Sequence, residues 1–406
     1  MTAMLRLEAA RERIIEAMTP VEGTESVLLD DALDRVLADP VHAAADVPPR
    51  ANSAMDGYAL AGRDLPAAGE VSLAIVGTSL AGRPWSGTVP PESCVRIMTG
   101  ALLPAGSDTV VMQEQVRVEG DRAVFGTGHR PGQHVRPPGE DLRAGDLAVD
   151  TGTLLGPPQL GLLAALGVGR VTVRRRPRVA IFSTGDELRP VDAPLEPGQV
   201  HDSNRHALRA LLARLAVEVR DLGIVPDTPE ATREALEAAA AWADAIVTTG
   251  GVSVGDADHV TGALGRGGHV DFWKVAMKPG KPVAFGRYGR AAFFGLPGNP
   301  VSAIVTWCQL VRPALQRLTG ATPEAPLTLR AVCLSRLGKS PGRLEFQRGV
   351  LERDPSGRWF VRSTGHQGSG VLRSMSSANA FIVLPLEQGD VEPGSEVDVQ
   401  PFAGLW

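Results

Sequence analysis

Residues 244–259, which read DAIVTTGGVSVGDADH, combine an apolar run, a glycine-rich turn and two acids. The apolar run at 245–247 is typical of a buried parallel strand, and the paired glycines after it let the backbone turn and expose amides to an anion. Asp256 and Asp258 follow the turn. In open α/β sheets ligands bind at the carboxyl ends of strands, so we expect an anion or a metal here. The stretch has neither GxGxxG nor the Lys-Ser/Thr of a P-loop, so neither common nucleotide motif is involved.

Two further loops follow apolar strands in the same part of the chain, STGDEL at 183–188 and GLPGNPVS at 295–302. Each alone would usually be only a turn. Three such loops on one sheet should converge on the same edge, which favours a binding site. The candidate substrate-binding residues, with one from a neighbouring helix start, are Thr184, Gly185, Asp186, Asn204, Gly250, Gly251, Ser253, Pro297, Gly298, Asn299, Pro300 and Ser302.

Three acids are candidates for catalysis at this edge. Glu187 and Asp256 each follow a glycine-rich turn that a helix cap would not require. Their oxygen ligands suit Mg²⁺ attached to a phosphorylated substrate. Asp227 stands at a helix start, where capping and catalysis are equally compatible with its position.

Lys278 and Lys281 flank a Pro-Gly turn in the segment KPGKP. Lysines in a loop are normally solvated, but the turn fixes the separation of these two, and a rigid pair of ammonium groups could clamp an oxyanion. Arg348 and Ser369, from the C-terminal part of the chain, could add donors. The alternative for both is an ordinary polar position on a strand surface.

The bulk properties are those of a multidomain globular protein. At 406 residues we expect two to four domains, and a net charge of −5 gives no general attraction for nucleic acid or membrane. The three cysteines lie far apart and form neither a metal motif nor a disulfide framework. The charged amphipathic N-terminus is not a signal peptide and no apolar run reaches membrane-spanning length, so a cytoplasmic location is expected.

The pattern of elements changes three times along the chain. Residues 1–172 begin with a helical stripe and contain an inserted all-β module at about 48–139, where short apolar runs are split by Gly and Pro. Residues 173–318 alternate strand, loop and helix, which predicts a doubly wound sheet with helices on both faces. Residues 319–406 again predict only strands.

The inserted module carries further polar motifs. PPRANSAMDGYA contains Asp56, RIMTGALLPAGSD contains Thr99, and the GEDL string just beyond the module contains Asp141. By themselves these stretches would be explained as hairpin corners and a loop.

Taken together, the motifs resemble the MoeA family of molybdopterin molybdenumtransferases, which includes the E domain of gephyrin. The matching strings, in family order from 48 to about 385, are NSAMDGYA, IMTGALLPAGSDTVV, GEDL, STGDEL, HDSN, GGVSVGD, KPGKP, GLPGNPVS and GSGVLRSMSSANAFIVLP. The resemblance implies a homodimer of elongated subunits. It also implies an N-terminal region with an inserted β module, a central molybdopterin-binding α/β domain and a C-terminal β-barrel.

The resemblance further implies a reaction in which adenylylated molybdopterin and molybdate yield molybdenum cofactor and AMP with help from Mg²⁺. The three loops would hold the pterin phosphate and adenylate, and Glu187 and Asp256 would serve the metal or proton transfer. The molybdate site implied by the motifs is Lys278, Lys281, Arg348 and Ser369. Asp56, Thr99 and Asp141 would approach from the partner subunit. Residues 257–259 depart from the family, which often has an aromatic residue there.

Two alternatives stay open. One is a non-catalytic cofactor-binding or scaffolding dimer of the gephyrin E type, which would not need Glu187, Asp256 and the lysine pair together. The other is a phosphate-binding α/β enzyme unrelated to pterins. The sequence leaves open molybdate against tungstate and whether a molybdopterin adenylyltransferase docks as a partner. The absence of a Ser-His-Asp or Cys nucleophile motif is consistent with phosphoanhydride cleavage by charge neutralisation.

Overall fold

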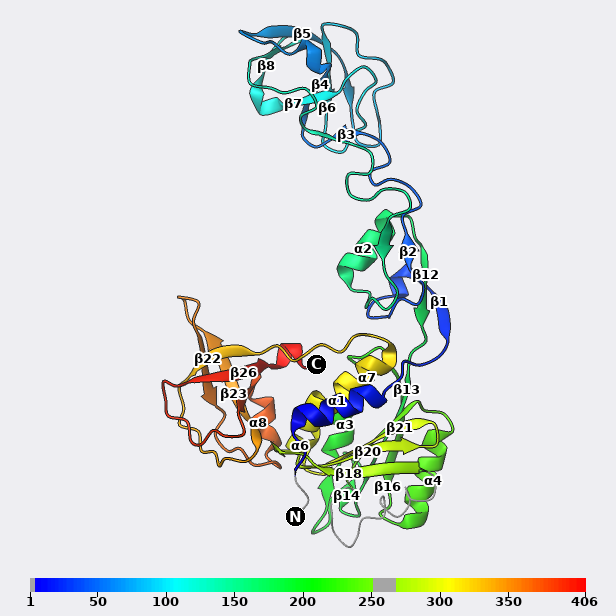
Figure 1. Cartoon of the computed structure of the whole chain (residues 1–406), viewed down its shortest axis with the longest axis vertical. Coiled ribbons are helices and arrows are strands. Elements are labelled where there is room, and N and C mark those ends of the chain that lie inside the picture. Colours follow the sequence, from blue (N-terminus) through cyan, green and yellow to red (C-terminus); the bar gives the residue numbers. More distant parts are fainter. Residues whose placement is uncertain (1–3, 251–267) are drawn as a thin grey trace.

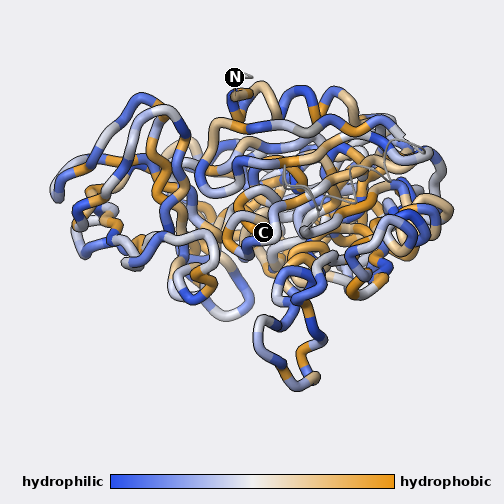
Figure 2. The backbone as a smooth tube through the Cα atoms, turned by 90° about the horizontal axis from the view of Figure 1, so that it is seen from below, coloured by the Kyte–Doolittle hydropathy of each residue, from blue (hydrophilic) through white to orange (hydrophobic). Residues whose placement is uncertain are grey.

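The computed structural model describes residues 4–250 and 268–406 of the chain. The molecule is elongated: a β module forms one end, a thin linker follows, and a central α/β domain with a barrel beside it forms the other end (Figure 1). Figure 2 shows hydrophobic segments concentrated in the body of the molecule and hydrophilic ones in the outer loops. No helix in the two described stretches is long and apolar enough to cross a membrane.

The N-terminal helix α1 (Leu7–Ala17) has its apolar residues at helical spacing and buries Leu7, Ala10 and Ile14. These side chains join the largest core cluster, together with residues of the late helices of the central domain. The helix therefore packs on the central domain, although about 160 residues of linker and β module separate the two in sequence.

The linker contains two strand pairs and a helix. Each strand pair joins a segment that precedes the β module in the sequence to a segment that follows it. Strand β1 (Thr24–Leu28) pairs with β12 (Arg170–Arg174), and β2 (Val41–His42) pairs with β11 (Leu147–Val149). A 3₁₀ turn, η1 (Leu29–Asp31), and helix α2 (Pro157–Ala165) cover them. Leu37, Leu163 and Val173 belong to its small core.

The distal β module is a six-stranded sheet in the order β7-β4-β6-β5-β9-β8, with a separate β3–β10 pair. The strands are β3 (Asn52–Ser53), β4 (Gly57–Leu60), β5 (Val71–Ser79), β6 (Ser93–Ile97), β7 (Thr109–Met112), β8 (Val116–Glu119), β9 (Arg122–Phe125) and β10 (Val135–Arg136). Two 3₁₀ turns, η2 (Gly62–Asp64) and η3 (Gln113–Gln115), complete it. The prediction of an all-β insertion is confirmed, because short apolar runs between Gly and Pro form pairing strands.

The central domain is a six-stranded sheet in the order β16-β13-β17-β21-β20-β18. Its strands are β13 (Arg178–Thr184), β16 (Glu218–Val225), β17 (Ala245–Thr249), β18 (Gly268–Lys274), β20 (Pro282–Tyr288) and β21 (Ala291–Leu296). The first four in this order are parallel, and β20 and β18 add an antiparallel edge. A small parallel pair, β14 (Leu188–Arg189) with β15 (Val200–His201), lies outside the sheet.

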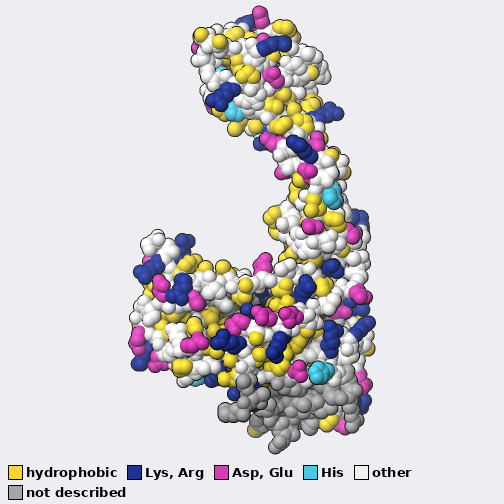
Figure 3. All heavy atoms as spheres, viewed as in Figure 1, with side chains coloured by type: hydrophobic (Ala, Val, Ile, Leu, Met, Phe, Trp, Pro, Cys, Tyr) yellow, Lys and Arg dark blue, Asp and Glu magenta, His cyan; other side chains and the backbone are white. Residues whose placement is uncertain are grey.

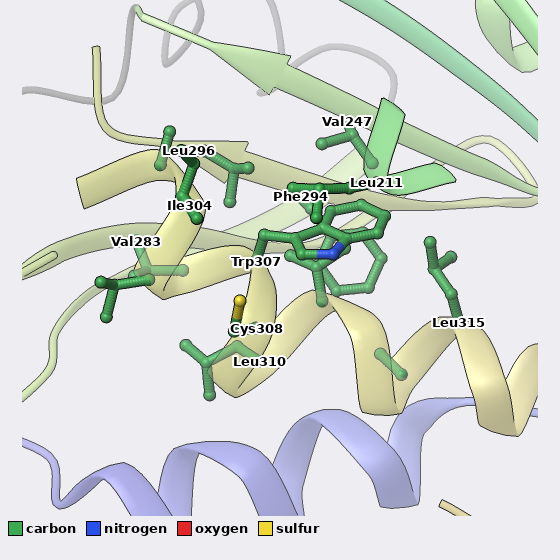
Figure 4. Close-up of a cluster of buried hydrophobic side chains, with 14 of the residues drawn as sticks. Leu211, Val247, Val283, Phe294, Leu296, Ile304, Trp307, Cys308, Leu310 and Leu315 are labelled. Carbon is green, nitrogen blue, oxygen red and sulfur yellow. The ribbon is translucent and has the colours of Figure 1, made fainter. Parts of the chain in front are cut away.

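Helices cover both faces of this sheet, so the predicted doubly wound domain is confirmed. Helix α3 (Ser203–Leu212) joins one core with α1 and with the continuous helical run of α6 (Pro300–Thr306), the π-helical turn η4 (Trp307–Val311) and α7 (Arg312–Thr319). Helix α4 (Pro229–Ala240) covers the other face through Leu236 and Ala239. Figure 4 shows the first core, where the Trp307 ring lies among Leu211 of α3 and Val247 and Phe294 of the sheet.

The C-terminal domain is a closed five-stranded barrel. The order β23-β24-β22-β26-β25 returns to β23 through a second pairing. Its elements are β22 (Leu329–Cys333), β23 (Leu344–Arg353), β24 (Trp359–Ser363), α8 (Leu372–Ser376), β25 (Ala380–Leu384), β26 (Glu396–Pro401) and η5 (Phe402–Gly404). The short strand β19 (Met277–Lys278) of the central domain pairs with β23 and ties the two domains together. The predicted C-terminal β-barrel is confirmed, but the prediction of strands alone missed α8 and η5.

Candidate active site

A cavity of about 660 Å³ lies at the carboxyl ends of the parallel strands. Its lining residues are Thr184, Gly185, Glu187, Leu188, Val200, His201, Asp202, Ser203, Asn204, Asp227, Gly250, Pro282, Pro297, Gly298, Asn299, Pro300 and Gly370. The structure thus brings together residues from all three glycine-rich loops. This happens because the carboxyl ends of parallel strands share one edge of a sheet.

The first loop turns directly after β13. Gly185 has φ +149°, and a Cβ added there would lie 2.5 Å from Glu187 Oε2. The Glu187 carboxylate therefore lies against the bare Gly185 backbone at the edge of the cavity, where its side chain is exposed. A larger residue at 185 would displace this acid.

The second loop leaves β17 beside the first. The buried hydroxyls of Ser183 and Thr249 are 3.0 Å apart and join the two strands at their ends. Gly250 has φ +85°, and a Cβ there would lie 2.3 Å from the Thr184 carbonyl oxygen. Only glycine fits this position. The other predicted residues of this loop, Gly251, Ser253, Asp256 and Asp258, lie outside the described residues.

The third loop precedes α6. Asn204 of α3 donates its Nδ2 hydrogen to the Gly298 carbonyl over 2.6 Å and so fixes the loop to the first helix of the domain. A Cβ on Gly298 would be 3.9 Å from the Gly250 Cα, so the second and third loops are neighbours. Ser302 is buried in α6 and does not line the cavity.

Two lining side chains keep polar atoms without partners. Thr184 is only 4% exposed, and within the described structure its Oγ1 has no hydrogen-bond partner. The same holds for Asn204 Oδ1. Buried polar atoms are normally satisfied, so these two are available to a ligand in the cavity.

The acids of the cavity have different surroundings. Asp202 caps α3, accepting from the Arg205 backbone N–H at 3.2 Å and from its Nε at 3.0 Å, so its charge is compensated. Asp186 lies outside the lining, and its Oδ1 accepts from the Asp227 N–H at 3.3 Å. Glu187 and Asp227 both line the cavity.

Lysine and arginine are absent from the described lining, although carboxylates are present. No group of three His, Cys, Asp or Glu in the described stretches is arranged to hold a metal by itself. Mg²⁺ usually needs only one or two carboxylates when a substrate phosphate completes its coordination. Glu187 and Asp227 are oxygen donors of this kind, so the described residues fit Mg²⁺ bound together with a phosphate.

The KPGKP loop reaches the cavity through Pro282. Gly280, with φ +103°, packs against α6, where a Cβ would lie 2.7 Å from Thr306 Oγ1. Lys278 is 43% exposed and its Nζ is 3.0 Å from Oε1 of the buried Glu345 in β23. Lys281 is exposed. The loop thus carries one lysine that is already paired and one that faces solvent.

Arg348 is buried in the barrel, with 1% of its surface exposed. Its guanidinium donates to Ser374 Oγ at 3.0 Å and to the Gly368 carbonyl at 3.1 Å. Burial lowers its pKa to about 10, against the opposing effect of Glu345. The side chain holds the 368–374 segment in place.

That segment connects the barrel to the cavity. The Ser369 carbonyl accepts from the Val301 N–H of α6 at 3.0 Å, and Gly370 lines the cavity. Ser369 is therefore joined to the third loop by a backbone hydrogen bond, and the Arg348 side chain holds the segment that makes this contact. Gly370 and His201 are lining residues that the sequence prediction missed, although both occur in its quoted strings GSGV and HDSN.

Asp56, Thr99 and Asp141 are not brought to the cavity of their own chain. Thr99 donates to Asp56 Oδ1 from both its N–H and its hydroxyl, each over 2.7 Å, and the backbone hydrogen bond is the main cause of a lowered Asp56 pKa. Both residues lie in the distal module, at the opposite end of the molecule from β14 and α6 (Figure 1). The exposed Asp141 lies between β10 and β11, outside the cavity lining.

This combination of domains and cavity defines a class of proteins in which a doubly wound α/β domain carries the binding site, flanked by a β-barrel and a distant β module. Three family descriptions match the chain in order. The MoeA N-terminal region (domain I and II) matches residues 5–167, the probable molybdopterin binding domain 180–317, and the MoeA C-terminal region (domain IV) 330–402. The chain belongs to the MoeA family.

Individual relatives match nearly the whole of this chain. A protein of Haemophilus influenzae named molybdopterin molybdenumtransferase is 43% identical over 404 residues, covering 99% of this chain and 100% of that protein. Gephyrin of Dictyostelium discoideum is 33% identical, covering 92% of this chain and 58% of gephyrin. The solved molybdopterin biosynthesis moeA protein of Pyrococcus horikoshii is 29% identical with a TM-score of 0.83, covering 98% of this chain and 100% of that one.

Proposed function

We propose that this chain is a molybdopterin molybdenumtransferase that uses adenylylated molybdopterin and molybdate and forms molybdenum cofactor and AMP. The observation that carries the proposal is the cavity of about 660 Å³ in which three glycine-rich loops meet the barrel segment at Gly370 and the KPGKP loop at Pro282. Full-length relatives with this name support it. The scaffolding alternative is not favoured by these relatives.

Gly298 and buried polar atoms would bind the phosphates. Gly298 leaves space for a phosphate against the backbone, whereas Gly185 and Gly250 leave room for the Glu187 carboxylate and the Thr184 carbonyl. Thr184 Oγ1 and Asn204 Oδ1 are buried beside them without partners in the described structure and would bind donor or acceptor groups of the substrate. These contacts orient the bond between the two phosphate groups and exclude water from it.

Glu187, with Asp256 or Asp227, would hold Mg²⁺. The ion would supply the positive charge that the carboxylate-lined cavity needs in order to accept a phosphate. Glu187 or Asp256 would also take or return a proton as AMP leaves. In the proposed step an oxygen of bound molybdate, or a water molecule that molybdate activates, forms a bond to the adenylyl phosphorus, and the bond from that phosphorus to the bridging oxygen breaks. The dithiolene sulfurs then replace oxygen at molybdenum; the displaced oxygen leaves on AMP if molybdate attacked, or as water with the thiol protons if water attacked.

Lys278 and Lys281 would bind molybdate, helped by the 368–374 segment that Arg348 holds. Glu345 keeps the Lys278 ammonium beside β23. Asp56, Thr99 and Asp141 would reach the cavity from a second subunit, because in their own chain they lie away from it. Figure 3 shows a concave face between the linker and the barrel, and we propose that part of a second subunit lies there.

The functional unit in this proposal is a cytoplasmic homodimer. Its substrate must come from an adenylyltransferase, which we propose as a docking partner. The test is to incubate the purified chain with adenylylated molybdopterin, Mg²⁺ and molybdate and to measure AMP. Molybdate-stimulated AMP release is expected, and no release above a control without protein would refute the proposal.

A further inference from the structure

His201 is placed at the cavity by the backbone on both sides of it. It belongs to β15, which pairs in parallel with β14 so that His201 stands opposite Arg189. The Val200 N–H donates to the Glu187 carbonyl at 2.9 Å, and the Asp202 N–H donates to the Arg189 carbonyl at 3.0 Å. The position of His201 is therefore tied to the loop that carries Glu187.

The ring of His201 is oriented by one hydrogen bond. Its Nδ1 lies 3.0 Å from the Pro190 carbonyl oxygen. A carbonyl oxygen can only accept, so Nδ1 carries the hydrogen. Nε2 is then left as the basic nitrogen of the neutral ring, and within the described part of the chain it has no hydrogen-bond partner. His201 thus presents an unused proton acceptor among the residues that line the cavity.

The described lining of the cavity carries more acidic than basic side chains. The ionisable residues of the described lining are Glu187, His201, Asp202 and Asp227, so His201 is the one side chain among them that can become positive. Of the neighbouring charged groups, Asp202 is paired with Arg205. Arg189 donates to the backbone carbonyls of Asp186 and Leu188, and the Asp186 carboxylate accepts from the Asp227 N–H. A phosphate brought into this cavity would add negative charge and favour the imidazolium form.

We propose that His201 is a substrate-binding residue that takes up a proton at Nε2 when a phosphate-bearing ligand enters the cavity. The proton comes from the solvent, and the imidazolium then donates a charge-assisted hydrogen bond to a phosphate oxygen. The identity of the phosphate as that of an adenylylated pterin or of AMP rests on the proposed function. The contact itself rests on the cavity and on the ring orientation.

The test uses AMP as the ligand, with the full chain and Mg²⁺. Titration calorimetry at pH 7.5 in two buffers with different heats of ionisation measures the protons taken up on binding. The parent should take up a fraction of one proton. His201→Asn keeps a donor where Nδ1 bonds Pro190 but has nothing at the Nε2 position, so proton uptake should vanish and AMP should bind about 10-fold more weakly. His201→Gln keeps a neutral donor near the Nε2 position, so it should also lose proton uptake but bind AMP better than His201→Asn.

His206→Asn is the matched control, because His206 is exposed on α3 and does not line the cavity. It should bind AMP and take up protons like the parent. Persistent proton uptake in both His201 variants, or no AMP binding to the parent, would overturn the inference. AMP binding with His201-dependent proton uptake in a chain that releases no AMP from adenylylated molybdopterin would leave the inference standing and refute the proposed function. Normal AMP release from adenylylated molybdopterin without His201-dependent proton uptake would refute the inference and leave the proposed function standing.

Discussion

The two lysines of the KPGKP loop differ in what they already contact. Lys278 is paired with the buried Glu345, whereas Lys281 is exposed and forms no ion pair with a described residue. Replacing Lys281 with Gln should therefore remove a charge available to molybdate without affecting the fold. Replacing Lys278 with Gln should also leave Glu345 without its cation.

Both Lys278→Gln and Lys281→Gln should raise the molybdate concentration needed for AMP release, since each loses a charge-assisted contact of about 1.5–3 kcal/mol. Lys278→Gln should also melt at a lower temperature than the parent, and Lys281→Gln should not. Lys274→Gln, an exposed lysine before the loop, is the control. Unchanged molybdate dependence in both variants would place the anion elsewhere.

Glu187 is exposed at the cavity edge, where a carboxylate contributes little to folding stability. Glu187→Gln keeps the size of the side chain but removes the charge proposed to attract Mg²⁺. The variant should melt close to the parent while AMP release falls by orders of magnitude, and Asp256→Asn should behave alike. AMP binding should survive better than turnover, because the glycine loops are unchanged.

Glu196→Gln provides a control for the charge change, since Glu196 is an exposed acid that does not line the cavity. Chelation of Mg²⁺ should stop AMP release by the parent and by this control. Normal turnover of Glu187→Gln, or loss of its activity only together with its cooperative unfolding transition, would exclude the proposed role.

At the scale of elements, the site depends on close backbone contact between the ends of β13 and β17, which a side chain at position 250 would prevent. Gly250 directly follows β17, lies beside Gly298 of the third loop, and would place a Cβ 2.3 Å from the Thr184 carbonyl oxygen at the end of β13. Position 250 requires glycine for two reasons: its backbone is left-handed, with φ +85°, and it lies too close to the Thr184 carbonyl for a Cβ. Gly289, in the turn between β20 and β21, needs only the left-handed backbone, because at φ +57° a Cβ there would meet the Ala240 Cβ at 3.7 Å.

Gly250→Ala should therefore destabilise the protein more than Gly289→Ala. The control loses only the conformational term of about 1–2 kcal/mol, whereas Gly250→Ala must also move a strand end. Denaturant unfolding monitored by fluorescence gives the two free energies, and AMP binding should fall for Gly250→Ala alone. If the two variants lose the same free energy of unfolding and bind AMP equally well, the contact between Gly250 and the Thr184 carbonyl is not tight.

At the scale of the whole molecule, the distal module lies far from the cavity, so its polar residues cannot take part in the site of their own chain as it stands. Asp56 and Thr99 form a pair with two 2.7 Å hydrogen bonds in the distal module, yet nothing in that module meets the cavity of the same chain. A second copy could bring the pair to the cavity.

Mixing inactive Asp56→Ala subunits with inactive Glu187→Gln subunits should restore part of the activity. Each mixed dimer would contain one cleft with both defects and one cleft with none. The measurement is AMP release after subunit exchange, with each variant alone treated in the same way. If mass spectrometry shows mixed dimers but activity does not return, the cleft is not shared.

The sequence by itself determined the elements and the local turns. Period-two and period-3.6 patterns predicted the β module, the alternating central domain and the strands of the C-terminal region, because these patterns reflect which face of each element is buried. The three strand-to-helix loops were predictable for the same reason. Their glycines mark turns, and strand polarity places those turns on one edge.

Only the tertiary structure decided what each polar residue contacts. It placed Asp202 on Arg205, buried Arg348 behind the 368–374 segment, paired Lys278 with Glu345 and added Gly370 and His201 to the cavity. Except for Asp202 with Arg205, these relationships join residues from separate elements, and two of them, Lys278 with Glu345 and Gly370 with the cavity, join different domains. They depend on strand register and domain packing, which local periodicity does not contain, because the same sequence pattern is compatible with many arrangements of the elements it predicts.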